Sequence, residues 1–486
     1  MDDKNQTSIK SLTSKGIIWS AIEKFSVQGI TFIIQLVLAR LLAPSEYGII
    51  AMLAIFIQIS QILIDGGFAN ALIQKKQCTN EDYSTVFFFN VLIAVAAYLI
   101  LFFCSPIIAQ FYNITQLNLV LRILAIVIII NSLSIVQRTK LVKNVDFKSQ
   151  AFVSFTSSIL SGIIGIILAY NGYGVWALVW QQISNSFFCF FFYSLIVRWI
   201  PDVVYSRKSF RELFSFGSKL LISSLINTTY RNIYTIVIGK KFSSDDLGLY
   251  SRAEQFALFP SYNIANIISR VMYPVFSKIQ DDNVQLKSVY RKTIQYSSFI
   301  IFPLMFGLIS ISEPFILYFL TEKWAGAIIL LQILCLDWMF DHISALNLNL
   351  LYVKKRSDLA LKLEIIKKTY AIIILFCTLP FGLIWMCLGR VLYSVSVIFI
   401  NAYYTNRLIK LSIWQQLKDI LPYLLVSFLM CIIIENVICF IPSLIWKLII
   451  GITLGGILYF IISRICFKQI FYDVKNIIKN RYERLN

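Results

Sequence analysis

Long apolar runs recur along this chain, and they limit what it can fold into more than any other feature of the sequence. Three clear examples are NVLIAVAAYLILFFCSPIIAQF, LAIVIIINSLSIV with its flanks, and YLLVSFLMCIIIENVICFI. Such runs meet the length of roughly 18 residues that a helix needs to cross a hydrocarbon core about 30 Å thick. Of the 486 residues, 58% are hydrophobic and 14% are charged, which leaves more apolar surface than a water-soluble fold could bury. The sequence therefore predicts an all-α integral membrane protein.

Polar breaks divide the apolar runs into about fourteen transmembrane helices. The net charge is +19, and the Lys and Arg residues gather in alternate breaks. The breaks after even-numbered helices are the basic ones, and examples are Lys75 with Lys76, Arg207 with Lys208 and Arg211, and Lys354 with Lys355 and Arg356. The other breaks, such as LAPS and YNGYG, are short and nearly uncharged. Because basic loops stay on the cytoplasmic side, we expect both termini to be cytoplasmic.

An internal repeat divides the chain into two halves. LARLLAPSEYGIIAMLAIF (38–56) aligns without gaps on IGKKFSSDDLGLYSRAEQF (238–256), so that Gly48 matches Gly248 and Glu46 matches Asp246. SPIIAQFY (105–112) likewise resembles EPFILYFL (313–320). An even number of spans separates the two copies, so they share one orientation, as in carriers whose substrate site lies between two parallel repeats.

The repeat fixes the expected organisation: two pseudo-symmetric six-helix lobes plus two C-terminal helices. We expect a cytoplasmic N-terminal tail (1–15), an N-lobe (16–198), a cytoplasmic inter-lobe linker (199–212), a C-lobe (213–408), two further helices (409–467) and a cytoplasmic C-terminal tail (468–486).

Motifs of enzymes and metal sites are not found in the sequence. The nine cysteines form no CxxC pair, and the single histidine, His342, lacks the partners that a metal site requires. No phosphate-binding GxxxxGK[ST] or nucleophile GxSxG occurs, and the predicted outer loops are only a few residues long. A membrane glycan polymerase or ligase would need a catalytic outer loop, so a carrier without a metal or cofactor fits better than an enzyme.

Several segments together resemble a known transporter family. LARLLAPSEYGIIAM, LIDGGFANALIQKK, NVDFKSQA and AYNGYGVWALVWQQ are similar to the oligosaccharide flippases (Wzx type) of the polysaccharide transporter family, within the multidrug/oligosaccharidyl-lipid/polysaccharide exporter superfamily. The resemblance is densest over residues 12–185. A multidrug or small-solute antiporter of the same fold is the alternative, and it would have a more acidic cavity.

The resemblance implies both an activity and its partners. It implies a cavity lined by helices 1, 2, 7 and 8, and transfer of undecaprenyl-pyrophosphate-linked oligosaccharide from the cytoplasmic to the outer leaflet of the bacterial inner membrane. The partners would be the lipid-linked oligosaccharide, membrane lipids and other polysaccharide-assembly proteins, and not nucleic acid.

Charged residues inside these helices are the candidate functional residues, because a charge at the bilayer centre costs roughly 2.5–3.5 kcal/mol and usually faces a cavity or a partner. Lys24, Arg231 and Arg252 are predicted to bind the pyrophosphate, for which Arg offers a planar two-pronged donor. Local pairing or snorkelling to the interface is the competing interpretation for Glu23, Lys24 and Glu254. Glu23 and Glu254 could carry a coupling proton or sodium ion. A structural pairing role is expected for Arg122, Asp337, Asp341, Glu364 and Arg390.

The segment LIDGGFANALIQKK carries a carboxylate and two glycines near the cytoplasmic end of its helix. Gly66 and Gly67 predict a bend or a close helix approach. Asp65 and Arg270 occupy nearly equivalent depths in the two halves. We therefore expect Asp65, Gly66, Gly67 and Arg270 to form a gate at the cytoplasmic side, with pairing of Asp65 inside its own lobe as the alternative.

Overall fold

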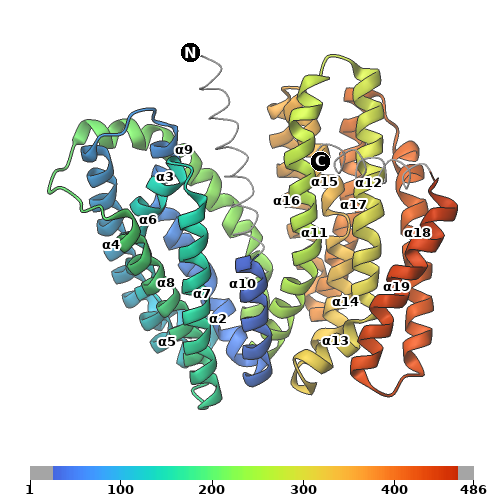
Figure 1. Cartoon of the computed structure of the whole chain (residues 1–486), viewed down its shortest axis with the longest axis horizontal. Coiled ribbons are helices and arrows are strands. Elements are labelled where there is room, and N and C mark those ends of the chain that lie inside the picture. The colour runs from blue at the N-terminus through green and yellow to red at the C-terminus, as the bar shows by residue number, and fades with distance from the viewer. Residues whose placement is uncertain (1–25, 469–486) are drawn as a thin grey trace, which may run out of the picture. The chain divides into compact units, whose positions relative to one another are not determined.

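Every regular element that the computed structural model describes is a helix (Figure 1). The described residues are 26–468, without the side chains of Phe216 and Lys219. Within them, nine helical segments are long and apolar enough to cross a membrane. The all-α prediction is confirmed, and the chain is a multi-pass membrane protein. The helices Ser26–Leu41, Val175–Val197, Arg207–Arg231, Ser244–Lys278 and Ser357–Thr378 are not among the nine, so the number fourteen stays a prediction.

The chain divides into two compact units, Met1–Gly248 and Leu249–Asn486. The first contains Ser26–Leu41, α2 (Pro44–Asp65), α3 (Phe68–Gln74), α4 (Asn80–Tyr112), α5 (Gln116–Leu124), α6 (Ile126–Lys143), α7 (Phe147–Tyr170), α8 (Val175–Val197), α9 (Arg207–Arg231) and α10 (Ile233–Lys241). The helix α11 (Ser244–Lys278) begins in the first unit and continues into the second.

The second unit continues from α11 with eight α-helices and two short 3₁₀ turns, Glu322–Trp324 and Leu379–Phe381. The α-helices are α12 (Asn283–Ser310), α13 (Ser312–Phe319), α14 (Ala327–Trp338), α15 (Asp341–Val353), α16 (Ser357–Thr378), α17 (Leu383–Ile409), α18 (Ile413–Cys439) and α19 (Leu444–Cys466).

In the first unit, polar residues set the helix ends and small residues set the packing. Thr79 caps α4 by accepting from the backbone N–H of Asp82, and Asp146 caps α7 in the same way at Ser149. The helix α8 packs against α6 and α7, and Gly165 on α7 brings its backbone close to Gln181 on α8. The outward face of α4 remains apolar and exposed, as expected of a surface that meets lipid.

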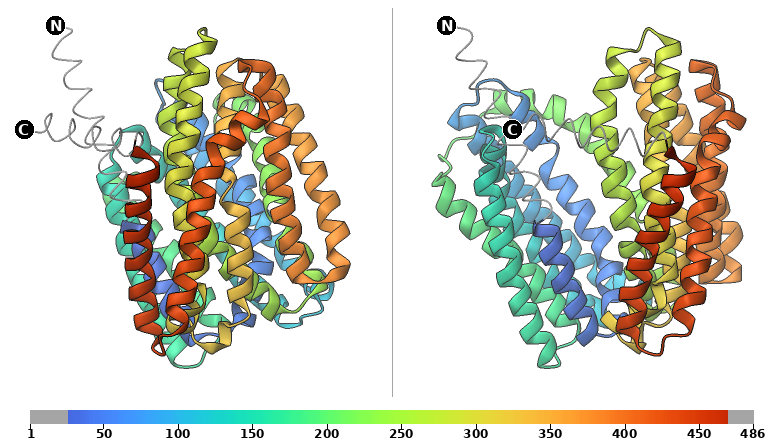
Figure 2. Two further views of the ribbon diagram at one scale, coloured as in Figure 1. Left: turned by 90° about the vertical axis from the view of Figure 1, so that its right-hand side faces the viewer. Right: turned by 45° about the vertical axis from the view of Figure 1, so that its right-hand side comes forward.

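In the second unit, the helices that follow the predicted repeat are attached to α12 (Figure 2). Arg291 on α12 donates from Nε and Nη2 to the two carboxylate oxygens of Asp419 on α18, over 2.7 and 2.8 Å. Tyr459 on α19 donates to the carbonyl oxygen of Phe299, 2.7 Å away. Figure 2 shows α18 and α19 side by side, so they form a pair fixed to the second unit.

The starts of α2 and α11 have the same local geometry at positions 200 residues apart. The backbone N–H of Ala43 donates to Glu46 Oε2 over 2.7 Å, and the backbone N–H of Ser243 donates to Asp246 Oδ2 over 3.2 Å. In both, a carboxylate in the first turn satisfies a backbone donor that the helix leaves open. This equivalence agrees with the repeat seen in the sequence.

Candidate functional site

A buried ion cluster joins three helices in the second unit. Arg390 on α17 donates from Nε and Nη2 to Asp337 Oδ2 on α14, over 2.8 and 2.7 Å. Its Nη1 donates to Glu254 Oε1 on α11 over 2.7 Å, and also to the hydroxyl of Tyr250. A structural pairing role was expected for both Arg390 and Asp337, and the structure shows that they pair with each other and that Glu254 shares the same arginine.

Helical spacing explains how three separate segments build this cluster. Tyr250 and Glu254 lie four residues apart on α11, and Arg390 and Ser394 lie four apart on α17, so each pair shares one helix face. Ser394 donates its hydroxyl to Asp337 Oδ1, so both oxygens of that carboxylate accept hydrogen bonds. Such pairing is what allows charged groups to remain inside an apolar helix bundle.

The members of the cluster differ in their access to solvent. The side chains of Asp337 and Arg390 are 7% and 12% exposed, whereas that of Glu254 is 26% exposed. Glu254 is therefore the most accessible carboxylate of the cluster, and its coupling role stays a prediction.

Two of the predicted pyrophosphate ligands can be located. Arg231 is the last residue of α9, in the first unit. Arg252 lies on α11 in the second unit, and its Nη1 donates to Gln255 Oε1 over 2.6 Å. Lying two residues from both Tyr250 and Glu254, Arg252 is on the opposite face of α11 from the ion cluster. Lys24 and Glu23 lie outside the described residues.

The predicted bend at Gly66 and Gly67 is a complete break between two helices. The helix α2 ends at Asp65, both glycines adopt left-handed φ angles of 52° and 75°, and α3 begins at Phe68. Only glycine takes this conformation without strain. Asp65 Oδ1 accepts from the backbone N–H of Ala69 over 3.2 Å, so this carboxylate caps α3 within its own unit.

Arg270 lies on α11 in the second unit, exposed at its surface. Since Asp65 and Arg270 belong to different units, their pairing stays a prediction.

Two of the remaining charged candidates, Arg122 and Glu364, have local partners. Arg122 donates from Nε to the hydroxyl of Ser105 over 2.9 Å and lies over the ring of Phe102. Glu364 forms an ion pair with Lys367. Among residues 26–468, no group of three or more His, Cys, Asp and Glu side chains is arranged to hold a metal ion.

Comparison with known sequences places this geometry in context. The model of a family described as "Polysaccharide biosynthesis protein" matches residues 37–329. The teichuronic acid biosynthesis protein TuaB of Bacillus subtilis (strain 168) is 29% identical over 361 residues, which are 73% of this chain and 74% of TuaB. The lipopolysaccharide biosynthesis protein WzxC of Escherichia coli (strain K12) is 26% identical over 88% of this chain and 89% of its own length.

A solved structure has the same fold. Lipid II flippase MurJ in an inward closed conformation matches with a TM-score of 0.75, over 93% of this chain and 100% of that chain. The sequence identity is 18%, so this similarity concerns the fold.

Proposed function

Because this chain belongs to the polysaccharide biosynthesis protein family, we propose that it is a flippase that moves lipid-linked oligosaccharide across the membrane for surface polysaccharide assembly. The proposal rests on two similarities that both extend over most of the chain, one of sequence and one of fold. The sequence is similar to that of the lipopolysaccharide biosynthesis protein WzxC, and the fold is that of a lipid II flippase. The protein is a transporter and not an enzyme.

The proposed substrate is an undecaprenyl-pyrophosphate-linked oligosaccharide, carried from the cytoplasmic to the outer leaflet of a bacterial inner membrane. Both termini lie on the cytoplasmic side, as the distribution of Lys and Arg indicates. The proposed mechanism is alternating access, in which the substrate site is exposed to one side of the membrane at a time.

We assign the pyrophosphate to Arg231 and Arg252, with Lys24 as a third cation. A guanidinium donates two parallel hydrogen bonds to a phosphate group and keeps its charge at every physiological pH. Glu254 is assigned to the coupling ion, a proton or sodium, because it is the most exposed carboxylate of the ion cluster. Glu23 is a second candidate for that role.

The activity is tested by deleting the gene. The expected result is a loss of surface polysaccharide together with accumulation of a lipid-linked oligosaccharide on the cytoplasmic side, which mass spectrometry of the lipid extract would identify. A plasmid copy of the gene should reverse both effects. Unchanged surface polysaccharide and no lipid-linked intermediate would refute the flippase.

The binding assignment is tested in the complemented deletion strain. Arg231→Ala and Arg252→Ala should each reduce export. Arg231→Lys and Arg252→Lys should retain part of it, because lysine keeps the positive charge but cannot form the bidentate hydrogen bonds of a guanidinium. Arg464→Ala is the matched control, since Arg464 is exposed in the last turn of α19. Full export by both alanine variants at normal expression would remove these arginines from the site.

A further inference from the structure

We infer that Lys140, near the end of α6, binds the phosphate group of an anionic phospholipid. The rings of Tyr83 and Trp199 enclose the ammonium of this lysine at one end of the first unit. Exposed apolar residues follow Trp199 in the chain. This site does not depend on the proposed flippase activity, because all of its contacts lie inside the first unit.

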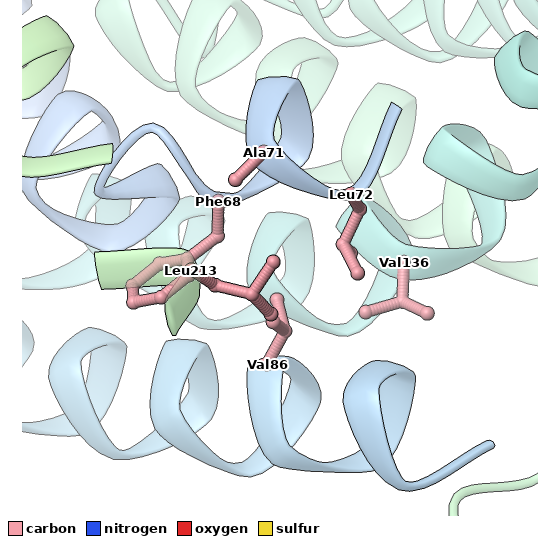
Figure 3. Packing of buried hydrophobic residues seen from close by; sticks show 6 residues of the cluster. All are labelled: Phe68, Ala71, Leu72, Val86, Val136 and Leu213. Carbon is pink, nitrogen blue, oxygen red and sulfur yellow. The ribbon is translucent and has the colours of Figure 1, made fainter. Parts of the chain in front are cut away.

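The hydrophobic cluster between α4 and α6 positions the lysine and the two rings. Figure 3 shows Val86 of α4 and Val136 of α6 in this cluster, and Tyr83 and Trp199 pack against it. Tyr83 lies three residues before Val86, and Lys140 lies four residues after Val136, so each shares a helix face with a member of the cluster. The packing of α4 against α6 therefore brings Lys140 and both rings together.

The ammonium of Lys140 lies against both rings. Its Nζ is 4.5 Å from the ring centroid of Tyr83 and 4.4 Å from that of Trp199. An ammonium at this distance is attracted to an aromatic face by the ring quadrupole. The two ring centroids are 6.4 Å apart, at an interplanar angle of 68°. The rings therefore hold the ammonium in place, but their faces do not accept a conventional hydrogen bond.

Hydrogen bonds to α4 fix Trp199 in this position. Its indole N–H donates to Asn80 Oδ1 over 2.6 Å. The backbone N–H of Asp202 donates to the hydroxyl of Ser84 over 3.0 Å, and Ser84 is fully buried. Because an interior group satisfies this backbone donor, the segment after Trp199 is held against α4. The enclosure of Lys140 is thus part of the fold.

Lys140 differs from the lysines around it in what its ammonium contacts. Lys143 donates to two carbonyl oxygens at the end of α3, over 3.0 and 2.6 Å. Lys75 forms ion pairs with Asp82 and Glu212, each over 3.1 Å. Within residues 26–468, the ammonium of Lys140 has neither a hydrogen-bond acceptor nor an ion pair. Its N–H groups are therefore available to a ligand.

The charges around Lys140 favour an anion as that ligand. The carboxylate of Asp202 acts on Lys140 electrostatically, but it forms no ion pair with the lysine in the described part of the chain. Its Oδ2 accepts a hydrogen bond from Asn80 Nδ2 instead. Arg198, exposed at the end of α8, places a second positive charge beside Trp199. Two positive charges and one negative charge leave a positive surplus, which attracts an anionic group.

Exposed apolar side chains accompany these cations. Ile200 and Val203, which follow Trp199, are 81% and 94% exposed. In a multi-pass membrane protein, apolar residues next to cations fit the boundary between acyl chains and lipid headgroups. Tryptophan and tyrosine are enriched at the same boundary. The two kinds of group match a phospholipid, in which an anionic phosphate adjoins apolar chains.

The chemistry of the site selects an anionic phospholipid over a zwitterionic one. Phosphate oxygens accept short, charge-assisted hydrogen bonds from an ammonium. A zwitterionic headgroup brings its own cation, which Lys140 and Arg198 repel. The distribution of Lys and Arg predicts that this end of α6 is cytoplasmic, and basic pockets between helices on that side of a membrane bind anionic headgroups.

Native mass spectrometry of the purified full-length protein tests the site. The probes are phosphatidylglycerol and phosphatidylcholine, each added to the protein in detergent. Lys140→Gln should weaken the binding of phosphatidylglycerol by about fivefold, the usual effect of one cation at an anionic membrane surface, and should leave that of phosphatidylcholine unchanged. Lys140→Arg keeps the charge and should bind phosphatidylglycerol within about twofold of the unaltered protein.

Two outcomes of this measurement would overturn the site. The first is binding of phosphatidylglycerol by Lys140→Gln as tightly as by the unaltered protein. The second is a loss confined to undecaprenyl pyrophosphate, added as a third probe, because the phosphate would then belong to the carrier lipid and not to a phospholipid.

Lys362→Gln is the matched control. It removes the same charge from α16, where Lys362 is exposed and has no ring contact among residues 26–468. Binding of phosphatidylglycerol should change by less than twofold. An equal loss in Lys140→Gln and Lys362→Gln would show that the lipid responds only to net charge, and it would overturn the site.

A second measurement uses the unaltered protein, so it decides the site whether or not Lys140→Gln folds. The protein in nanodiscs is treated briefly with an amine-acetylating reagent, and mass spectrometry of its peptides gives the extent of reaction at each lysine. Lys140 should react about fivefold more slowly in phosphatidylglycerol than in phosphatidylcholine, after division by the same ratio for Lys362. Equal ratios for the two lysines would overturn the site.

Discussion

At the scale of single residues, the charges inside the helices are explained by their partners. Arg390 donates to acceptors on α11 and α14, and Ser394 on its own helix satisfies the oxygen of Asp337 that Arg390 leaves open. The sequence shows that such residues need partners, because unpaired charges are costly in an apolar bundle. It does not show which ones, because Glu254 and Arg390 are 136 residues apart.

Arg390→Met should destabilise the protein by about 3–5 kcal/mol, because it leaves the buried carboxylate of Asp337 without its counter-ion. Adding Asp337→Asn should recover part of that loss, since the remaining side chain is neutral and can still accept from Ser394. Thermal unfolding in detergent measures both effects. Arg407→Met on the same helix, where the side chain is exposed, is the control and should change little. If Arg390→Met and the double variant lost the same stability, the lost charge pairing would not be the cause of the destabilisation.

At the scale of elements, glycine determines how closely helices approach. The contacts of Gly48 with Ser244 and of Gly67 with Gly217 are backbone against backbone, and no side chain can move aside to admit a methyl group. The sequence predicted a bend or a close helix approach at Gly66 and Gly67 from their position in an apolar run. It could not predict that α9 would supply the opposing glycine, because helix partners in a membrane leave little trace in hydrophobicity.

Gly48→Ala should destabilise the first unit by about 1–3 kcal/mol, the usual effect of forcing extra volume into a close-packed contact. Gly456→Ala on α19 is the matched control, because an added Cβ there meets nothing within 4 Å. Its effect should be neutral or slightly stabilising, since alanine favours helix more than glycine does. Comparison of the two melting temperatures checks the prediction, and equal values would argue against the close approach of α2 and α11.

At the scale of the whole molecule, the distribution of basic residues predicts the membrane orientation. The breaks that carry lysine and arginine alternate with short, nearly uncharged ones, and this pattern predicts that both termini are cytoplasmic. Within residues 26–468, nine helical segments are long and apolar enough to cross a membrane, and their orientation stays a prediction.

Cysteine labelling tests the orientation. In a background without the native cysteines, a membrane-impermeant maleimide should label Asn171→Cys in intact cells, because Asn171 is exposed at the end of α7 on the predicted outer side. Ser357→Cys, exposed at the start of α16, should react only after the membrane is permeabilised. The reverse pattern would invert the proposed topology and the direction of transport.

The sequence by itself determined the membrane environment, the helical class, the repeat and the family resemblance. These depend on hydrophobicity, charge and spacing, which are properties of short stretches of chain. Only the tertiary structure decided that α9 packs against the break between α2 and α3 and that Glu254 shares Arg390 with Asp337. The physical reason is that each of these depends on contacts between helices far apart in the sequence, and apolar helices in lipid differ too little in hydrophobicity for their own residues to specify a partner.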